Sequence, residues 1–151
     1  SSNATSLKSG EVATITFGFS EAPTGFDKSD ISVSGGTLSD LSTYDSTNRS
    51  YVATYTPATD SNAVITLSVS NDSFTDLAGN TNQDGSDSNN RLGITIDTKA
   101  PTFTSSNPGN GSTSIAADSN ITLVFSENYY NFVGNCPRYK RSDIRYIMNQ
   151  I

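Results

Sequence analysis

The sequence predicts an all-β protein in which short antiparallel strands pack as a β-sandwich. Apolar and polar residues alternate over short runs, as they do in strands that are buried on one face. Clusters of Gly, Pro, Asn, Asp and Ser lie between these runs and are typical of turns. No segment before residue 128 shows the spacing of an amphipathic helix. Strands and turns that recur in this way over about a hundred residues favour two packed sheets.

The first half of the chain carries three strand patterns. The run Glu11–Ser20 alternates most clearly, because its apolar residues all fall on one face. Asp30–Ser34 repeats the pattern over a shorter length, and Thr37–Tyr44 shows it more weakly. Gly35 and Gly36 separate these two runs and predict a strand-ending turn or a bulge. The residues that we expect to face the core are Ala13, Ile15, Phe17, Phe19, Ile31, Val33, Leu38 and Leu41.

The second half carries three more patterns. Tyr51–Thr56 alternates and ends at Pro57, because proline cannot donate to a strand ladder. Ala63–Ser70 and Leu92–Asp97 each place their aliphatic residues on a single side. The long polar stretch between them, residues 72–90, is predicted to be a loop. The residues that we expect to face the core are Tyr51, Ala53, Tyr55, Ala63, Ile65, Leu67, Val69, Leu92, Ile94 and Ile96.

The composition excludes several classes of function. The 151 residues include no His, no Trp, one Cys and one Met, and the net charge is −6. An acidic chain does not neutralise phosphates, so we expect no nucleic-acid partner. The lack of His excludes a Ser-His-Asp triad and an imidazole metal site, and a single Cys excludes an intrachain disulfide. We therefore expect no enzymatic activity, and no apolar run is long enough to predict direct membrane insertion.

A seven-residue motif occurs twice. Ile15–Glu21 reads ITFGFSE and Ile121–Glu127 reads ITLVFSE, so the copies differ at only two positions and lie 106 residues apart. This spacing is about the length of one sandwich domain. We interpret Ala100–Glu127 as the first two strands of a second copy. By the same offset, the first copy would begin a few residues before Ser1, and the chain would be a window on a tandem array.

Several stretches of the first domain form a recognisable combination: GEVATITFGFSEAPTGFDKSDISVSGGTLSDL (10–41), YVATYTPA (51–58), FTDLAGN (74–80) and ITIDTKAPT (94–102). In this combination, residues 6–102 resemble the bacterial Ig-like repeats of large secreted or surface-anchored adhesins of the biofilm-associated and RTX types. Residues 101–127 resemble a related but distinct Ig-like type. The resemblance implies an extracellular spacer that repeats many times, is stiffened by calcium and holds a distal adhesive domain away from the cell.

The last 24 residues differ from the rest. Residues 128–151 carry four bases and one acid, whereas residues 1–127 carry five bases and fourteen acids. We therefore predict a bacterial Ig-like domain at 1–99 with a truncated first strand, the first strands of a second at 100–127, and a non-matching tail at 128–151. We expect the tail to be disordered or to derive from a shifted reading frame. A genuine C-terminal appendage and a basic, aromatic binding segment are the alternatives.

Calcium is the one cofactor that the resemblance supports, and it needs several oxygen ligands. In this topology the loop after Glu21 and the loop that contains Asp76 and Asn80 share one pole. Asp97 ends the last strand at the other pole and would face Glu127, the counterpart of Glu21 in the next domain. An interdomain calcium ion would then bridge the two domains. The alternative is that Glu21 and Glu127 are solvated strand ends and that Asp76 begins a tight turn.

The leading hypothesis for function is a non-catalytic spacer or stalk module of a bacterial cell-surface or secreted adhesin. Its expected partners are the neighbouring Ig-like repeats of the same chain, and its expected location is extracellular or on the cell surface. A carbohydrate- or protein-binding Ig-like module is one alternative, for which exposed tyrosines at positions 44, 51 and 55 are candidates. Because Tyr51 and Tyr55 alternate inward, we expect them to pack in the core. An accessory domain of a secreted enzyme is the other alternative.

Overall fold

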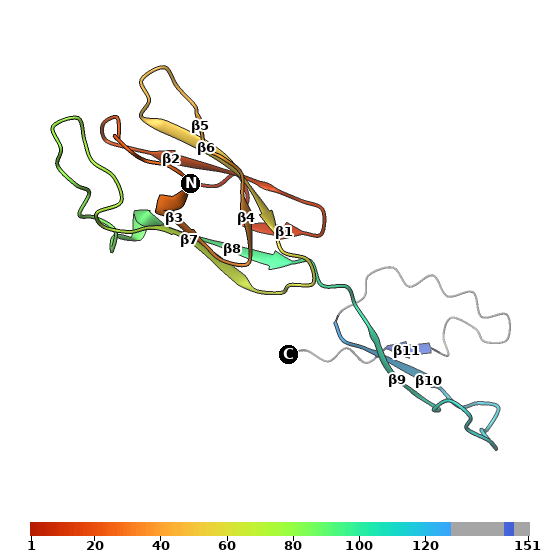
Figure 1. Ribbon diagram of the computed structural model, residues 1–151. Coiled ribbons are helices and arrows are strands. Elements are labelled where there is room, and N and C mark those ends of the chain that lie inside the picture. Colours follow the sequence, from red (N-terminus) through yellow and green to blue (C-terminus); the bar gives the residue numbers. More distant parts are fainter. Residues whose placement is uncertain (128–143, 147–151) are drawn as a thin grey trace. The chain divides into compact units, whose positions relative to one another are not determined.

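The chain divides into two compact units, Ser1–Lys99 and Ala100–Ile151 (Figure 1). The computed structural model describes residues 1–127 and 144–146. Apart from two 3₁₀ turns, η1 (Lys28–Asp30) and η2 (Ser88–Asn90), its regular elements are β-strands. The prediction of an all-β sandwich is therefore confirmed, and the two short turns are additions to it.

The first sheet of the first unit contains the strand that follows the long polar loop. Its order is β1-β8-β7-β3. Pairing is antiparallel between β7 and β8 and between β3 and β7. The strands are β1 (Ser6–Lys8), β3 (Ile31–Val33), β7 (Val64–Val69) and β8 (Arg91–Asp97).

The second sheet has the order β2-β6-β4, and β5 also pairs with β6. The predicted strand Thr37–Tyr44 is thus two strands, and Ser39 shows why. The Ser39 hydroxyl accepts a hydrogen bond from the Thr54 N–H at 2.9 Å, which takes the place of a ladder bond between two backbones. The strands are β2 (Ala13–Gly18), β4 (Gly36–Leu38), β5 (Ser42–Thr43) and β6 (Ser50–Pro57).

The N-terminal segment changes sheets. Ser2 forms an antiparallel bridge with Ile15 of β2, and the chain then crosses to pair β1 in parallel with β8. Leu7, at the centre of β1, lies opposite Ile96 in this parallel ladder. The sequence predicted antiparallel pairing throughout, and this parallel pair of the first unit differs because the first segment serves both sheets.

The core lies between the two sheets of the first unit. Tyr55 and the aliphatic side chains of β2, β7 and β8 are its most deeply buried members, as the alternation predicted. Ala63 was expected to face inward but is exposed, because β7 begins only at Val64. No residue from Asp97 to Glu127 is buried. The buried hydrophobic residues are Leu7, Ala13, Ile15, Phe26, Ile31, Leu38, Ala53, Tyr55, Ile65, Leu67, Val69, Ile94 and Ile96.

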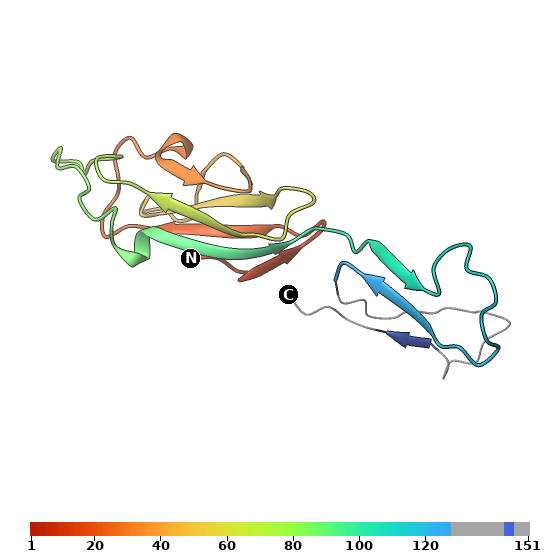
Figure 2. The same ribbon diagram turned by 90° about the horizontal axis from the view of Figure 1, so that it is seen from below.

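The second unit repeats the beginning of the first. Strands β9 (Phe103–Asn107) and β10 (Ile121–Phe125) pair antiparallel, and β11 (Ile144–Tyr146) pairs in parallel with β10 (Figure 2). Asn107 lies opposite Thr122, so the next pair of positions along this ladder is 108 and 121. These positions lie 106 residues after Ser2 and Ile15, which form the bridge in the first unit. The expectations for the rest of the tail fall on residues 128–143 and 147–151, which lie outside the described residues.

Candidate functional site

Two loops meet at one end of the first unit, opposite the end from which the chain leaves β8 (Figures 1 and 2). The loop that follows β2 and the long loop between β7 and β8 are joined by an antiparallel bridge between Thr24 and Thr75. Each of these threonines donates its N–H to the carbonyl oxygen of the other, at 2.6 and 3.1 Å. The two loops therefore share a pole, as the sequence predicted.

Asparagine side chains hold the long loop in shape. The Asn82 carboxamide oxygen accepts from the N–H groups of Ser73 and Phe74, at 2.8 and 3.2 Å, and its amide nitrogen donates to the Ser70 carbonyl. The Asn71 side chain accepts from the N–H of Gly85 at 2.6 Å. Short amides that bond nearby backbone are the usual means by which such loops satisfy their polar groups. Side-chain hydrogen bonds thus fix the conformation of this polar loop.

An aromatic cluster lies beneath the two loops. The Phe26 ring is central, with its centroid 4.8 Å from Phe19 and 5.6 Å from Phe74 in edge-to-face geometry. Phe17 and Tyr51 complete the cluster. The sequence placed the strand aromatics toward the core but overlooked Phe26 and Phe74, because neither lies in an alternating run. The available signal for Phe74 was its position as a lone phenylalanine in a mostly polar loop, which favours a packed side chain.

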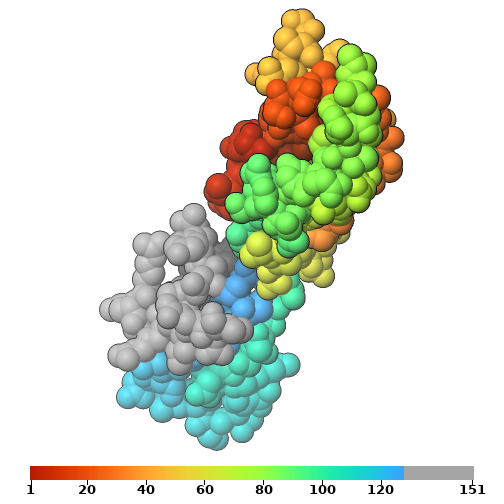
Figure 3. All heavy atoms as spheres, turned by 90° about the vertical axis from the view of Figure 1, so that its left-hand side faces the viewer, coloured from red at the N-terminus to blue at the C-terminus, as the bar shows by residue number. Residues whose placement is uncertain are grey.

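A groove of about 490 Å³ opens beside this cluster. In Figure 3, which faces this end of the first unit, the green loop residues run beside the red and orange N-terminal strands. The groove has an apolar floor from Phe17, Phe19 and Leu92 and a mostly acidic rim. The charged side chains that line it are Glu21, Asp76, Asp84 and Arg91.

The structure brings together three of the five predicted calcium ligands. Glu21, Asp76 and Asn80 all line the groove. However, the Asp76 carboxylate already accepts from the backbone N–H and the side-chain amide of Asn80, at 2.8 and 2.7 Å. This is the tight turn that was the alternative interpretation of the segment. Among the described residues, no three His, Cys, Asp or Glu side chains are placed to hold a metal ion. Calcium binding by Glu21, Asp76 and Asn80 stays a prediction.

The other two predicted ligands lie elsewhere. Asp97 is the exposed last residue of β8, whereas Arg91 at the start of the same strand lines the groove. Six residues of strand span about 20 Å, so Asp97 lies at the opposite pole from Glu21. Glu127 follows β10 and belongs to the second unit. A site that uses Asp97 and Glu127 therefore requires ligands from two units and stays a prediction.

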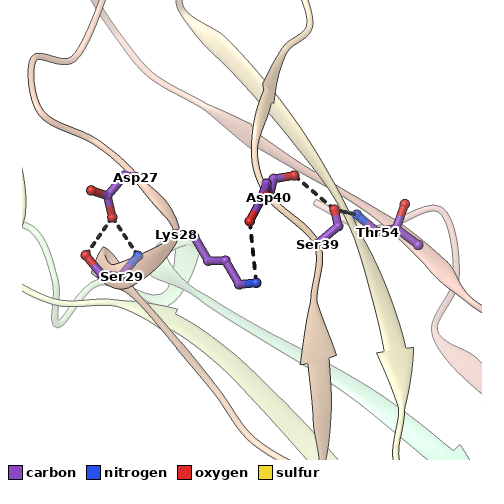
Figure 4. A network of polar contacts seen from close by, with 6 residues as sticks. All are labelled: Asp27, Lys28, Ser29, Ser39, Asp40 and Thr54. Carbon is purple, nitrogen blue, oxygen red and sulfur yellow. Dashed lines mark hydrogen bonds and ion pairs between the residues drawn. The ribbon is translucent and has the colours of Figure 1, made fainter.

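The pKa shifts of the surface carboxyls have local causes. The pKa of Asp76 is lowered from its ordinary value, first by the side-chain hydrogen bond from Asn80 and then by that residue's backbone N–H. The pKa of Asp27 is lowered mainly by the Ser29 hydroxyl, which lies 2.6 Å from the carboxylate (Figure 4). These carboxylates act as acceptors that close turns. Their lowered pKa values make them poor proton donors near neutral pH.

The first unit also has an exposed ion pair. Lys28 Nζ lies 3.7 Å from an Asp40 carboxylate oxygen, and both side chains are at least half exposed (Figure 4). Asp27 caps the η1 turn reciprocally, because it accepts from the Ser29 N–H while its own N–H donates to Asp30. Exposed pairs of this kind contribute about 0–1 kcal/mol, so this region is held mainly by its turn geometry.

Comparison with protein families gives two matches. A model of the bacterial Ig-like domain matches residues 1–92, which is more than half of the chain. A second, different model, also of a bacterial Ig-like domain, matches residues 97–132. Comparison with curated proteins and with solved structures gave no match. No helix in the described part of the chain is long and apolar enough to cross a membrane.

Proposed function

The chain belongs to the bacterial Ig-like domain family, and we propose on this premise that it is a non-catalytic spacer module of a bacterial adhesin. Domains of this family are common in surface proteins, usually lie outside the cell and are typically non-catalytic. An extracellular or cell-surface location is therefore expected for this chain. Its neighbours in the stalk would be further Ig-like units of the same polypeptide.

The pairing of the terminal strands of the first unit carries the proposal. β1 and β8 run parallel, with Ser6 opposite Thr95 and Lys8 opposite Asp97. The chain thus enters β1 at one end of the pair and leaves β8 at the other. Tension between the two ends of the unit would pull these strands past each other, so all of their hydrogen bonds would be strained together. Such a unit resists extension, as a stalk requires.

The link between the units is short. Thr98 is bonded within the first unit, because its hydroxyl donates to the Ala58 carbonyl at 2.7 Å. Thr102 is bonded within the second, because its carbonyl accepts from Ser126 at 2.9 Å. Only residues 99–101 lie between, and Pro101 restricts its own backbone and that of the residue before it. A short, restricted link suits a spacer.

Single-molecule force spectroscopy on the full chain tests the proposal. The first unit should unfold in one event that releases about 300 Å of chain, the extended length of the residues between β1 and β8. Leu7→Ala in β1 and Leu38→Ala in β4 form a matched pair, because both leucines are 3% exposed. Each should lower the free energy of unfolding by about 2–5 kcal/mol. Only Leu7→Ala should sharply lower the unfolding force, and equal effects on the force would contradict the proposal.

We also propose that calcium stabilises the junction between units through Asp97 and Glu127. Extracellular calcium modules bind with dissociation constants of about 10⁻⁴–10⁻³ M, and a hundredfold excess would stabilise by about 2.7 kcal/mol. The full chain should then melt at a higher temperature in calcium than in chelator. Asp97→Asn should abolish the increase, whereas Asp60→Asn, outside the predicted set, should keep it. An identical melting temperature in both buffers would refute calcium binding.

A further inference from the structure

The chain contains one Asn-Gly pair, Asn110-Gly111, and one Asp-Gly pair, Asp84-Gly85. In such a pair the side-chain carbonyl carbon can be attacked by the backbone nitrogen of the next residue, and glycine has no side chain to crowd the approach. Asparagine is accordingly among the thermolabile residues of proteins. The attack requires the peptide unit between the two residues to rotate, so the restraints on that unit decide whether the pair reacts.

The peptide unit between Asp84 and Gly85 is held at both ends. The Gly85 N–H donates to the Asn71 side-chain oxygen at 2.6 Å. The Asp84 carbonyl accepts from the Asn90 side-chain amide at 2.7 Å and from the Asp87 N–H at 2.8 Å. The Gly85 nitrogen cannot turn toward the Asp84 carboxyl unless these hydrogen bonds break first.

The peptide unit between Asn110 and Gly111 lacks such restraints. Both residues are exposed, in the turn that joins β9 to β10 (Figure 1). In the described part of the chain, neither the Asn110 carbonyl and side chain nor the Gly111 N–H has a hydrogen-bond partner. The turn is closed around them by one backbone bond, from the Ser112 N–H to the Gly109 carbonyl at 3.2 Å. This central peptide unit can therefore rotate without losing a hydrogen bond of its own.

The backbone angle at Gly111 points the same way. Its φ of 78° is that of the third residue of a type II turn. Type I and type II turns differ by reversal of the central peptide unit, so both orientations of the Gly111 N–H belong to ordinary turn forms. A Cβ atom at Gly111 would meet nothing within 4 Å, so no neighbouring group hinders the approach of the Asn110 side chain.

We propose that Asn110 is a site of spontaneous deamidation and that the fold protects Asp84 from the corresponding isomerisation. At Asn110 the Gly111 nitrogen loses its proton to a base in the solvent and attacks the side-chain carbonyl carbon, Cγ. An N–Cγ bond forms, the Cγ–Nδ2 bond breaks, and the side-chain nitrogen takes up a proton and leaves as ammonia. The product is a cyclic succinimide. Water then opens the ring at either carbonyl and gives aspartate or isoaspartate.

The reaction changes the turn between β9 and β10 in two ways. Both products add one negative charge to a segment, residues 100–127, that contains two acids and no base. Isoaspartate also routes the main chain through the side-chain methylene group, which lengthens the backbone of the turn by one carbon. The second unit thus acquires charge with time, and the reaction needs only water.

Incubation of the full chain at mildly alkaline pH, followed by peptide mapping with mass spectrometry, tests the proposal. Aspartate and isoaspartate should appear at Asn110 before any other asparagine changes, and ion exchange should detect a more acidic form of the chain in parallel. Asp84 should gain no isoaspartate over the same period. Earlier reaction of another asparagine, or isomerisation of Asp84 as fast as deamidation of Asn110, would contradict the proposal.

Unfolding separates the effect of the fold from that of the sequence. In guanidinium chloride the hydrogen bonds around Gly85 are lost, so Asp84 should isomerise about tenfold faster than in the folded chain. The rate at Asn110 should change by less than about threefold, because its peptide unit has no hydrogen bonds to lose. Equal acceleration at the two sites would show that the fold does not distinguish them.

A matched pair of substitutions identifies the reacting residue. Asn110→Gln should abolish the acidic form, because closure through the longer side chain requires a larger and less readily formed ring. Asn120→Gln changes another exposed asparagine, which precedes the β-branched Ile121 of β10, and should leave the rate unchanged. Persistence of the acidic form in Asn110→Gln, or its loss in Asn120→Gln, would overturn the assignment to Asn110.

Discussion

At the scale of single residues, Tyr55 connects the core to the turn between β3 and β4, where the chain passes from one sheet to the other. Its side chain is fully buried, and its hydroxyl donates to the Gly35 carbonyl at 2.9 Å and lies 3.2 Å from that of Ser34. Burial also raises the pKa of this phenol. The expectation that Tyr55 packs in the core is thus confirmed, whereas Tyr44 is 71% exposed.

Tyr55→Phe should lower the free energy of unfolding by about 1 kcal/mol, because it removes the hydrogen bonds that the buried phenol makes with the Ser34 and Gly35 carbonyls. Tyr44→Phe is the matched control and should change this free energy by less than about 0.5 kcal/mol, as surface substitutions do. Urea denaturation of both variants measures the difference. Equal effects would show that the Tyr55 hydroxyl contributes nothing to the crossing.

Asp76 links stability to pH. Its pKa in the folded chain lies below the ordinary value of 3.8, so folding favours the ionised carboxyl. Its contribution to stability is complete above the pKa of the unfolded chain and is lost as the pH falls through the folded pKa. The Asp76→Asn variant should therefore show a flatter loss of stability in acid than the unmodified chain. Urea denaturation between about pH 2 and pH 6 measures this.

Asp60→Asn is the control for this series. Asp60 receives no side-chain hydrogen bond from any described residue, and its φ of 55° is one that asparagine tolerates. This variant should follow the acid dependence of the unmodified chain. If both variants give the same curve, the Asn80 hydrogen bonds do not couple Asp76 to folding.

At the scale of elements, the crossing from β3 to β4 depends on two glycines. Gly35 has a φ of 61°, a conformation that side chains disfavour. A Cβ atom at Gly36 would overlap the carbonyl oxygen of Thr56 and the hydroxyl of Tyr55. The sequence predicted a turn or bulge here, and the structure adds that the turn carries the chain from one sheet to the other.

Gly36→Ala should destabilise the chain by about 1–3 kcal/mol, the usual cost of overpacking. Gly18→Ala provides the comparison, since a Cβ atom there meets nothing within 4 Å and β2 is extended. It should be neutral or slightly stabilising. Thermal melts of the two variants distinguish steric overlap at the crossing from a general intolerance of glycine replacement.

At the scale of the whole molecule, the first unit holds the core. Within residues 1–127, all of the buried hydrophobic residues lie between Leu7 and Ile96. The second unit, as far as it is described, has one antiparallel pair and one short parallel strand. Its β10 repeats the motif of β2, but each of its residues remains only half-buried.

A chain that ends at Lys99 should therefore keep the main melting transition of the full chain. We expect a shift smaller than about 4 °C, the shift that ~1 kcal/mol produces in a domain of this size. Differential scanning calorimetry of both chains in chelator, which removes any effect of calcium, makes the comparison. A much lower melting temperature would mean that the second unit stabilises the first.

The sequence by itself determined most of the strands of the first unit and the faces that they bury. Alternation has a period of two in the chain, so Ile15, Ile65 and Ile94 could be assigned to the core without a structure. The repeated motif likewise revealed the second unit. The alternation and the repeated motif can both be recognised along the sequence, without knowledge of long-range contacts.

Only the tertiary structure decided which strands pair and what gathers at the pole. The parallel pairing of β1 with β8 and the contact of Phe26 with Phe74 join residues far apart in sequence, and no local pattern encodes such distances. The structure also showed that the Asp76 carboxylate accepts hydrogen bonds from the backbone and side chain of Asn80. Side-chain type alone predicted calcium ligands at this pole, and only the folded structure decides that the Asp76 carboxylate closes a turn there, because its acceptor oxygens meet the Asn80 donors.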